Sequence, residues 1–193
     1  MLPWAAELYK RRVATFGHDR PMTRCMPHGV PDAMTVLNLP FKVIQTPVVT
    51  IHLYEEFHKY RQIHIDGRRL PVDPDPNWYG YSIGRWENDT FVVETAGFKE
   101  GSWLDNNGHP HTDALRTTER FRRLDFGRMD LAVTIDDPKA YARPWTSDTL
   151  HFLLQADTEL LEHLCENNRD EERLQEIWKD QRPPGQPVPG AIR

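Results

Sequence analysis

The pattern of apolar and polar residues along the chain changes its period near residue 41. Before that point, apolar side chains recur at helical spacing from Trp4 to Phe16, behind a proline at position 3. This pattern predicts a short N-terminal helix with proline in its first turn. After it, apolar and polar residues alternate, which is typical of half-buried strands. The alternating runs span residues 41–56, 59–67, 81–98, 114–137, 147–155 and 158–167.

Tight turns divide the two longest runs into hairpins. Asn88-Asp89 provides the turn of the 81–98 hairpin, and Asp125 to Gly127 provides that of the 114–137 hairpin. Roughly seven to nine consecutive antiparallel strands with short turns favour an up-and-down barrel or a strongly curved sheet. We therefore predict a mainly β protein, a single antiparallel β-barrel of lipocalin-like shape.

The C-terminal part of the chain has a different composition. Residues 168–181 are polar, with Leu174, Ile177 and Trp178 as an apolar face, and predict a short helix packed outside the barrel. Residues 182–193 form a proline-rich tail. With a length of 193 residues, the chain is most simply a single domain over residues 1–181 followed by this tail.

Charge and missing motifs exclude several classes of function. A net charge of -5, without a basic cluster interleaved with aromatic residues, argues against nucleic-acid binding. No apolar run is long enough to insert into a membrane. There is no G-x-S-x-G, H-E-x-x-H, P-loop, Rossmann or C-x-x-C signature, so no nucleotide, flavin or nicotinamide cofactor is expected. No signal peptide is present, and Met1 directly before the first helix suggests a start downstream of a removed leader.

Glu119 is the first candidate for chemistry. On a strand it shares a face with Leu115, Thr117 and Phe121, which is the apolar, inward face. A buried carboxylate tends to have a raised pKa, which suits a general acid or base. The alternative is a structural ion pair with an inward arginine such as Arg85.

The stretch "GSWLDNNGHPHTDAL" (101–115) holds the second candidate site, with His109 and His111 on either side of a proline. It leads into the strand of Glu119 and is expected at one mouth of the barrel. His111 could transfer protons, oriented by Asp105 or Asp113. Alternatively, His109 and His111 could bind a transition metal, or the segment could be a plain loop. The third metal ligand would then be one of Asp105, Asp113, Glu119 and His64.

Aromatic residues provide candidate walls for a pocket. Trp86 shares a strand face with Ser82 and Gly84, and these small neighbours leave room for a ring against the sheet. The residues expected to contact a substrate are Trp86, Trp103, Tyr79, His64 and Arg85.

Two cysteines occur, Cys25 and Cys165, and from the residues alone either a disulfide or two reduced thiols is open. The strings "FKVIQTP", "DGRRLPVDPDPNWYGYSIGRWENDTFVVETAGF", "WLDNNGHPHTDALRTTERFRR", "TIDDPKAYARPWT" and "LLEHLCENN" add a further argument. Through them, roughly residues 20–170 resemble a large family of exported bacterial proteins that has no assigned activity. This resemblance implies export to the periplasm or the extracellular space, and it favours a Cys25–Cys165 disulfide.

The leading hypothesis is an exported enzyme, a lyase, isomerase or hydrolase, that acts on a small molecule in the barrel mouth. His111 and Glu119 would transfer protons without a cofactor, and Asp105 or Asp113 would orient the histidine. The first alternative is a small-ligand-binding barrel without catalysis. The second is a metalloprotein with His109 and His111 as ligands. The sequence leaves a homodimer open.

Overall fold

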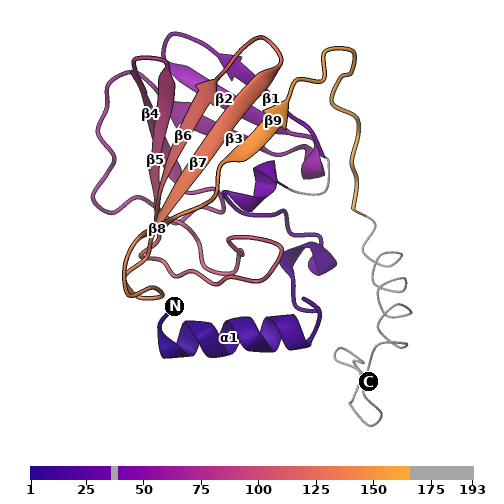
Figure 1. The fold of residues 1–193 in the computed structure, drawn as a ribbon, viewed down its shortest axis with the longest axis vertical. Helices are drawn as coiled ribbons and strands as arrows, with labels where there is room; N and C mark the ends of the chain where they lie inside the picture. Colours follow the sequence, from indigo (N-terminus) through magenta and orange to yellow (C-terminus); the bar gives the residue numbers. More distant parts are fainter. Residues whose placement is uncertain (36–38, 166–193) are drawn as a thin grey trace.

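The computed structural model describes residues 1–35 and 39–165 (Figure 1). Its helical elements are α1 Pro3–Ala14 and three 3-10 turns, η1 Pro21–Arg24, η2 Asp32–Met34 and η3 Glu56–His58. Its strands are β1 Phe41–Gln45, β2 Val49–Tyr54, β3 Tyr60–His64, β4 Tyr81–Glu87, β5 Thr90–Ala96, β6 Arg116–Arg123, β7 Arg128–Asp136, β8 Trp145–Thr146 and β9 Leu150–Leu153. The described part of the chain is therefore mainly β, as predicted.

The strands form a curled mixed sheet, a half-barrel, and the predicted closed antiparallel barrel is wrong. Neighbours follow in the order β1 to β8, with β9 also paired to β7. All pairs are antiparallel except β3 and β4, which run parallel. Parallel neighbours need a long connection, and residues 65–80 provide it. Alternation along a strand defines its two faces but not its direction or its partner, so the sequence pattern could not exclude this arrangement.

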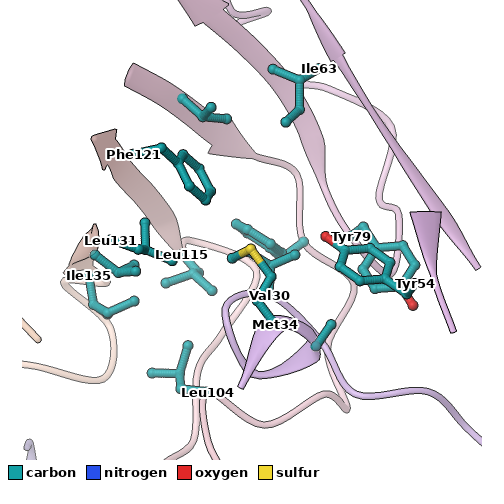
Figure 2. Packing of buried hydrophobic residues seen from close by; sticks show 14 of the residues in the cluster. Val30, Met34, Tyr54, Ile63, Tyr79, Leu104, Leu115, Phe121, Leu131 and Ile135 are labelled. Atoms are coloured by element: carbon teal, nitrogen blue, oxygen red, sulfur yellow. The ribbon is translucent and has the colours of Figure 1, made fainter. Parts of the chain in front are cut away.

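Side chains fill the concave side of the half-barrel. Val30 and Met34 come from the segment before the first strand and pack among Tyr79, Leu115 and Leu131 (Figure 2). At the free edges of the sheet, the rings of Phe41 on β1 and Phe152 on β9 meet edge to face at 5.4 Å. The concave side is therefore a packed core built from both the sheet and the N-terminal segment.

Helix α1 confirms the predicted N-terminal helix and lies across the loops at one end of the sheet (Figure 1). The indole of Trp4 donates to the carbonyl of Lys139 at 2.8 Å, and the guanidinium of Arg12 donates to the carbonyl of Gly108 at 3.0 Å. Within the described residues, no helix is long and apolar enough to cross a membrane. The predicted C-terminal helix and the tail 182–193 lie outside the described residues.

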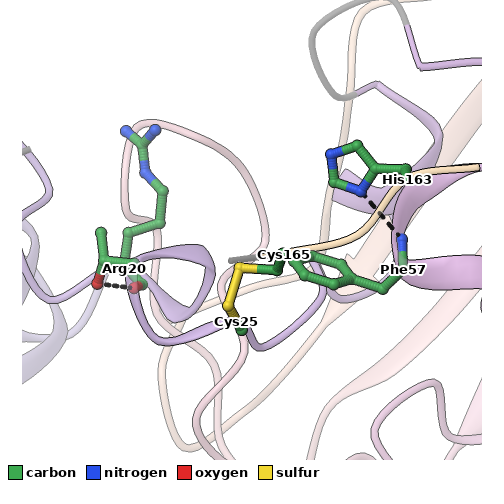
Figure 3. Close-up of a disulfide and its surroundings, with 6 residues drawn as sticks. Arg20, Cys25, Phe57, His163 and Cys165 are labelled. Carbon is green, nitrogen blue, oxygen red and sulfur yellow. Dashed lines mark hydrogen bonds between the residues drawn. A yellow bond between two sulfur atoms is a disulfide. The ribbon is translucent and has the colours of Figure 1, made fainter. Parts of the chain in front are cut away.

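Cys25 and Cys165 form a disulfide, so the pairing implied by the family resemblance is confirmed (Figure 3). Hydrogen bonds support the segment before Cys165. The backbone N–H of Leu161 donates to the Glu55 carboxylate at 2.6 Å, and the backbone N–H of Phe57 donates to His163 Nδ1 at 3.3 Å. The last described residues are thus attached to the turn around η3.

Candidate functional site

Glu119 lies on the concave face, as strand parity predicts, and is completely buried. Its partner is Arg61 of β3, with Nη1 at 2.9 Å from Oε1 and Nη2 at 2.5 Å from Oε2. Arg61 also donates from Nε to Ser82 Oγ at 3.0 Å and from Nη2 to Thr95 Oγ1 at 2.7 Å. Burial lowers the pKa of Arg61, but the Glu119 carboxylate outweighs that effect and raises it. Through these contacts Arg61 links four strands, β3 to β6, in the core.

The arginine suggested from the sequence, Arg85, is not this partner. Its side chain is 47% exposed on the convex face, where it pairs with Glu94 and Glu87. Ser82 faces inward on the same strand, and alternation therefore places Arg85 outward. Because Glu119 is bound at both oxygens and buried away from the pockets described below, the structure favours the ion-pair alternative over an acid–base role.

His111 is also buried, and both of its ring nitrogens are engaged. The carbonyl of Thr112 lies 3.0 Å from Nδ1 and can only accept a hydrogen bond, so Nδ1 carries the proton. Nε2 then accepts from Ser102 Oγ at 2.6 Å. Burial lowers the pKa of His111, which keeps the ring neutral. Asp113, one predicted orienting group, instead forms a surface ion pair with Lys139 at 2.7 Å.

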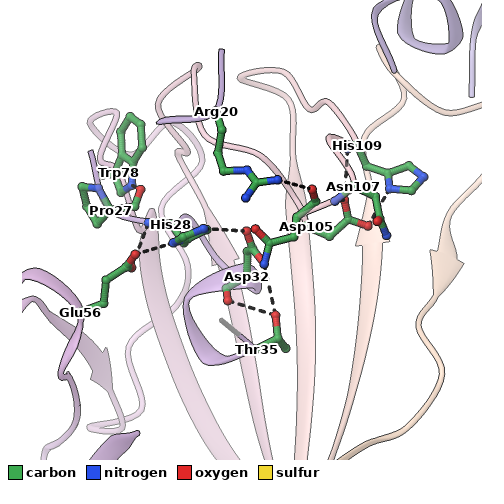
Figure 4. A network of polar contacts seen from close by, with 11 residues as sticks. Arg20, Pro27, His28, Asp32, Thr35, Glu56, Trp78, Asp105, Asn107 and His109 are labelled. Carbon is green, nitrogen blue, oxygen red and sulfur yellow. Dashed lines mark hydrogen bonds and ion pairs between the residues drawn. The ribbon is translucent and has the colours of Figure 1, made fainter. Parts of the chain in front are cut away.

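His109 is the histidine that Asp105 orients (Figure 4). Nδ1 of His109 donates to Asp105 Oδ2 at 2.6 Å. The other carboxylate oxygen accepts from the backbone N–H groups of Asn107 at 3.0 Å and His109 at 3.2 Å. Burial raises the pKa of Asp105, but these hydrogen bonds outweigh it, and the pKa lies below its ordinary value. The carboxylate is therefore ionised and fixed, and the imidazole ring is held in one orientation.

A pocket of about 440 Å³ opens beside this pair. One face of the His109 ring stacks on Tyr9 with 4.4 Å between ring centroids, and His109 remains 26% exposed. Tyr141 is fixed in the wall by donating its hydroxyl proton to the carbonyl of Pro110 at 2.9 Å. The lining residues are Met1, Asp105, His109, Tyr141, Ala142, Arg143 and Trp145. An oriented histidine, two aromatic rings and a guanidinium thus share one opening.

A second pocket, of about 360 Å³, lies between η3 and residues 160–162. It contains Glu55 and His58, but both have structural partners. Glu55 accepts from Leu161, and His58 Nε2 accepts from the backbone N–H of His163 at 3.0 Å. These groups attach the C-terminal segment, so this pocket is the weaker candidate.

The aromatic and polar residues predicted to contact substrate do not line the pocket beside His109. Tyr79 is buried against Tyr54, and Trp103 lies beneath the guanidinium of Arg12. Trp86 is 55% exposed on the sheet, and His64 lies beside Tyr81. Of the predicted site residues, the structure brings only Asp105 and His109 together in this pocket.

Sequence reasoning missed the part of the wall formed by Tyr141, Arg143 and Trp145. Their signal was present as two rings and an arginine at alternate positions in "AYARPWT". What could not be seen is that the loop after β7 returns to α1, where the backbone N–H of Leu2 donates to the carbonyl of Ala140 at 2.7 Å.

A buried polar network, also missed, lies on the other side of the Asp105 segment (Figure 4). His28 donates from Nδ1 to one oxygen of Glu56 and from its backbone N–H to the other at 3.0 Å, while Nε2 lies 3.8 Å from Asp32. Burial raises the pKa of Asp32 to about 6, although His28 opposes this. Burial lowers the pKa of His28, but the carboxylates of Glu56 and Asp32 outweigh burial and raise it.

The geometry does not support a shared metal on His109 and His111. His111 has no free ring nitrogen, and Nδ1 of His109 is bound to Asp105. Across residues 1–35 and 39–165, no three His, Cys, Asp or Glu side chains are grouped so that they could hold a metal ion. Comparison of the chain with protein-family models, curated proteins and solved structures finds no match.

Proposed function

We propose that this protein is a small-molecule enzyme that works by acid–base chemistry, with His109 rather than His111 as the proton-transferring residue. The observation that carries the proposal is the 2.6 Å hydrogen bond from His109 Nδ1 to Asp105 at the wall of an open pocket. A carboxylate on one ring nitrogen fixes the tautomer and stabilises the imidazolium that forms when the other nitrogen takes a proton.

The remaining nitrogen, Nε2, points away from Asp105 (Figure 4). As a base it would remove a proton from a substrate carbon or from a water molecule, and as an acid it would return that proton. The described lining residues include no Ser, Thr, Cys or Lys side chain that could act as a nucleophile. The site therefore supports elimination, isomerisation or water-mediated hydrolysis, rather than a covalent acyl-enzyme route.

The Cys25–Cys165 disulfide supports an exported protein as part of this proposal. Disulfides persist in oxidising compartments such as the periplasm and the extracellular space, and are rare in the cytosol. This agrees with the export implied by the family resemblance.

The test is turnover of a panel of β-hydroxy acids, keto acids and small esters. The enzymes compared are wild type, His109→Gln, Asp105→Asn and the control His151→Gln, whose residue lies on the exposed strand β9. For any substrate that wild type converts, we expect His109→Gln to lose about 100-fold or more in kcat. Asp105→Asn should lose activity as well, and His151→Gln should match wild type. Turnover that survives His109→Gln would refute the assignment.

A second candidate is a ligand-binding protein without turnover. It predicts that Glu119 is fully paired to an arginine, and the bond to Arg61 fulfils that condition. Its expected barrel cavity is instead filled by Val30 and Met34, so binding would have to use the pocket beside His109. This candidate would be favoured by a ligand that binds wild type and His109→Gln with equal affinity and that neither protein converts to a product.

A further inference from the structure

The carboxylate and the guanidinium in the wall of the pocket beside His109 are not paired with each other. Asp105, the carboxylate in its wall, already accepts three hydrogen bonds from within its own loop. Arg143 is exposed, and within the described part of the chain its side chain has no ion pair and no hydrogen bond. The pocket therefore presents a guanidinium whose N–H donors are free to bind a ligand.

The groups next to Arg143 are flat and apolar. Trp145 lies two residues further along the chain, and its ring meets that of Tyr141 edge to face with 5.7 Å between centroids. Trp145 also approaches the His109 ring, at 6.4 Å between centroids. Aromatic walls favour a planar or unsaturated ligand, and a volume of about 440 Å³ has room for one small ring.

We propose that the substrate is a small organic carboxylate with a planar apolar part. Its carboxylate would bind the Arg143 guanidinium, and its planar part would lie against Trp145, near His109. A planar guanidinium matches a carboxylate through two parallel hydrogen bonds. A single arginine also suits a monoanion better than a phosphate dianion, which needs hydrogen-bond donors from several groups. That the bound acid is converted rests on the proposed function. That it binds at Arg143 does not.

The experiment is a ¹⁵N–¹H NMR titration at low salt, with benzoate as the charged probe and benzamide as its neutral counterpart. Three proteins are compared: wild type, Arg143→Gln and Arg116→Gln. Arg116 is exposed at the start of β6 and does not line the pocket, so its variant removes the same charge from outside the pocket. Chemical shifts of the Trp145 indole and of the loop 105–111 report where the probe binds.

Benzoate should bind wild type about tenfold more tightly than benzamide, because a hydrogen bond to a charged group adds that much in a partly open site. Arg143→Gln should lose this preference, whereas Arg116→Gln should keep it. Equal affinity for the two probes, absence of binding, or an unchanged preference in Arg143→Gln would overturn the inference. Tighter binding of inorganic phosphate than of benzoate would also overturn it.

The two proposals fail in different ways. If His109→Gln keeps turnover while Arg143→Gln loses benzoate binding, the anion site stands and the acid–base assignment fails. If His109→Gln abolishes turnover while Arg143→Gln binds benzoate as wild type does, the catalytic histidine stands and the substrate class fails.

Discussion

Replacing Glu119 by glutamine should destabilise the protein strongly, although the change is isosteric. The substitution leaves the Arg61 guanidinium in the core, 1% exposed, without its counter-ion. Removing one partner of a buried ion pair costs about 3–5 kcal/mol. In a protein of this size each kcal/mol lowers Tm by about 2–4 °C, so we expect Tm to fall by about 6–20 °C.

Replacing both partners should cost less than replacing one. In the double variant Arg61→Met with Glu119→Leu no buried charge remains, and such apolar replacements of buried pairs are often neutral or stabilising. Ser82 and Thr95 would lose Arg61, but their hydroxyl groups already lie 3.0 Å apart and can hydrogen-bond to each other. We therefore expect the double variant to have nearly the stability of wild type, and Glu119→Gln to be less stable than both.

Urea denaturation followed by circular dichroism measures these differences directly. The matched control is Glu94→Gln, which breaks the exposed pair with Arg85 on the convex face and should cost about 1 kcal/mol or less. The reasoning would be refuted if Glu119→Gln stayed within about 1 kcal/mol of wild type. It would also fail if the double variant lost as much stability as the single variants Arg61→Met and Glu119→Leu lose together. The two residues would then contribute to stability independently of each other.

Three further predictions concern other parts of the fold. Reduction of the Cys25–Cys165 disulfide should lower stability by about 2–4 kcal/mol, measured as a lower urea midpoint with reductant and reproduced by the double serine variant. A histidine with a raised folded-state pKa stabilises fully below its unfolded pKa, near 6.5, and loses that contribution as pH rises. Wild type should therefore lose stability relative to His28→Gln as the pH rises from 6.5 to 8; an equal slope in both proteins would exclude a contribution from His28. Gly29→Ala places a methyl group 2.6 Å from the side chain of Ser102 and should cost about 1–3 kcal/mol by thermal melting, whereas the methyl group of Gly127→Ala meets Asp125 at an ordinary contact distance of 3.9 Å, and this variant should be nearly neutral.

The sequence identified the burial of Glu119 because that property depends on local alternation alone. Its partner could not be found in the same way, since Arg61 reaches it only through the parallel pairing of β3 and β4. No local pattern encodes that pairing. The prediction of a closed antiparallel barrel was wrong for the same reason, because local alternation does not show which strands pair or in which direction they run.

The two histidines around Pro110 show a finer limit of sequence reasoning. Both were recognised as candidates, and Asp105 was named as a group that orients His111, whereas in the structure Asp105 orients His109 and His111 is buried. Which of them is buried depends on contacts with Ser102 and Tyr9, and these lie in separate parts of the fold. The pattern H-P-H therefore does not decide which histidine faces solvent.

The disulfide described above joins residues separated by 140 positions, and all nine strands lie between them. Topologically, the β-sheet is thus part of a covalent ring. A protease that cuts one surface loop inside this ring opens it without releasing a fragment, because both pieces remain linked through sulfur. A nicked molecule would then migrate as a full-length chain on a non-reducing gel and separate into two bands only after reduction. One bond would in this way preserve the sheet against a single proteolytic cut.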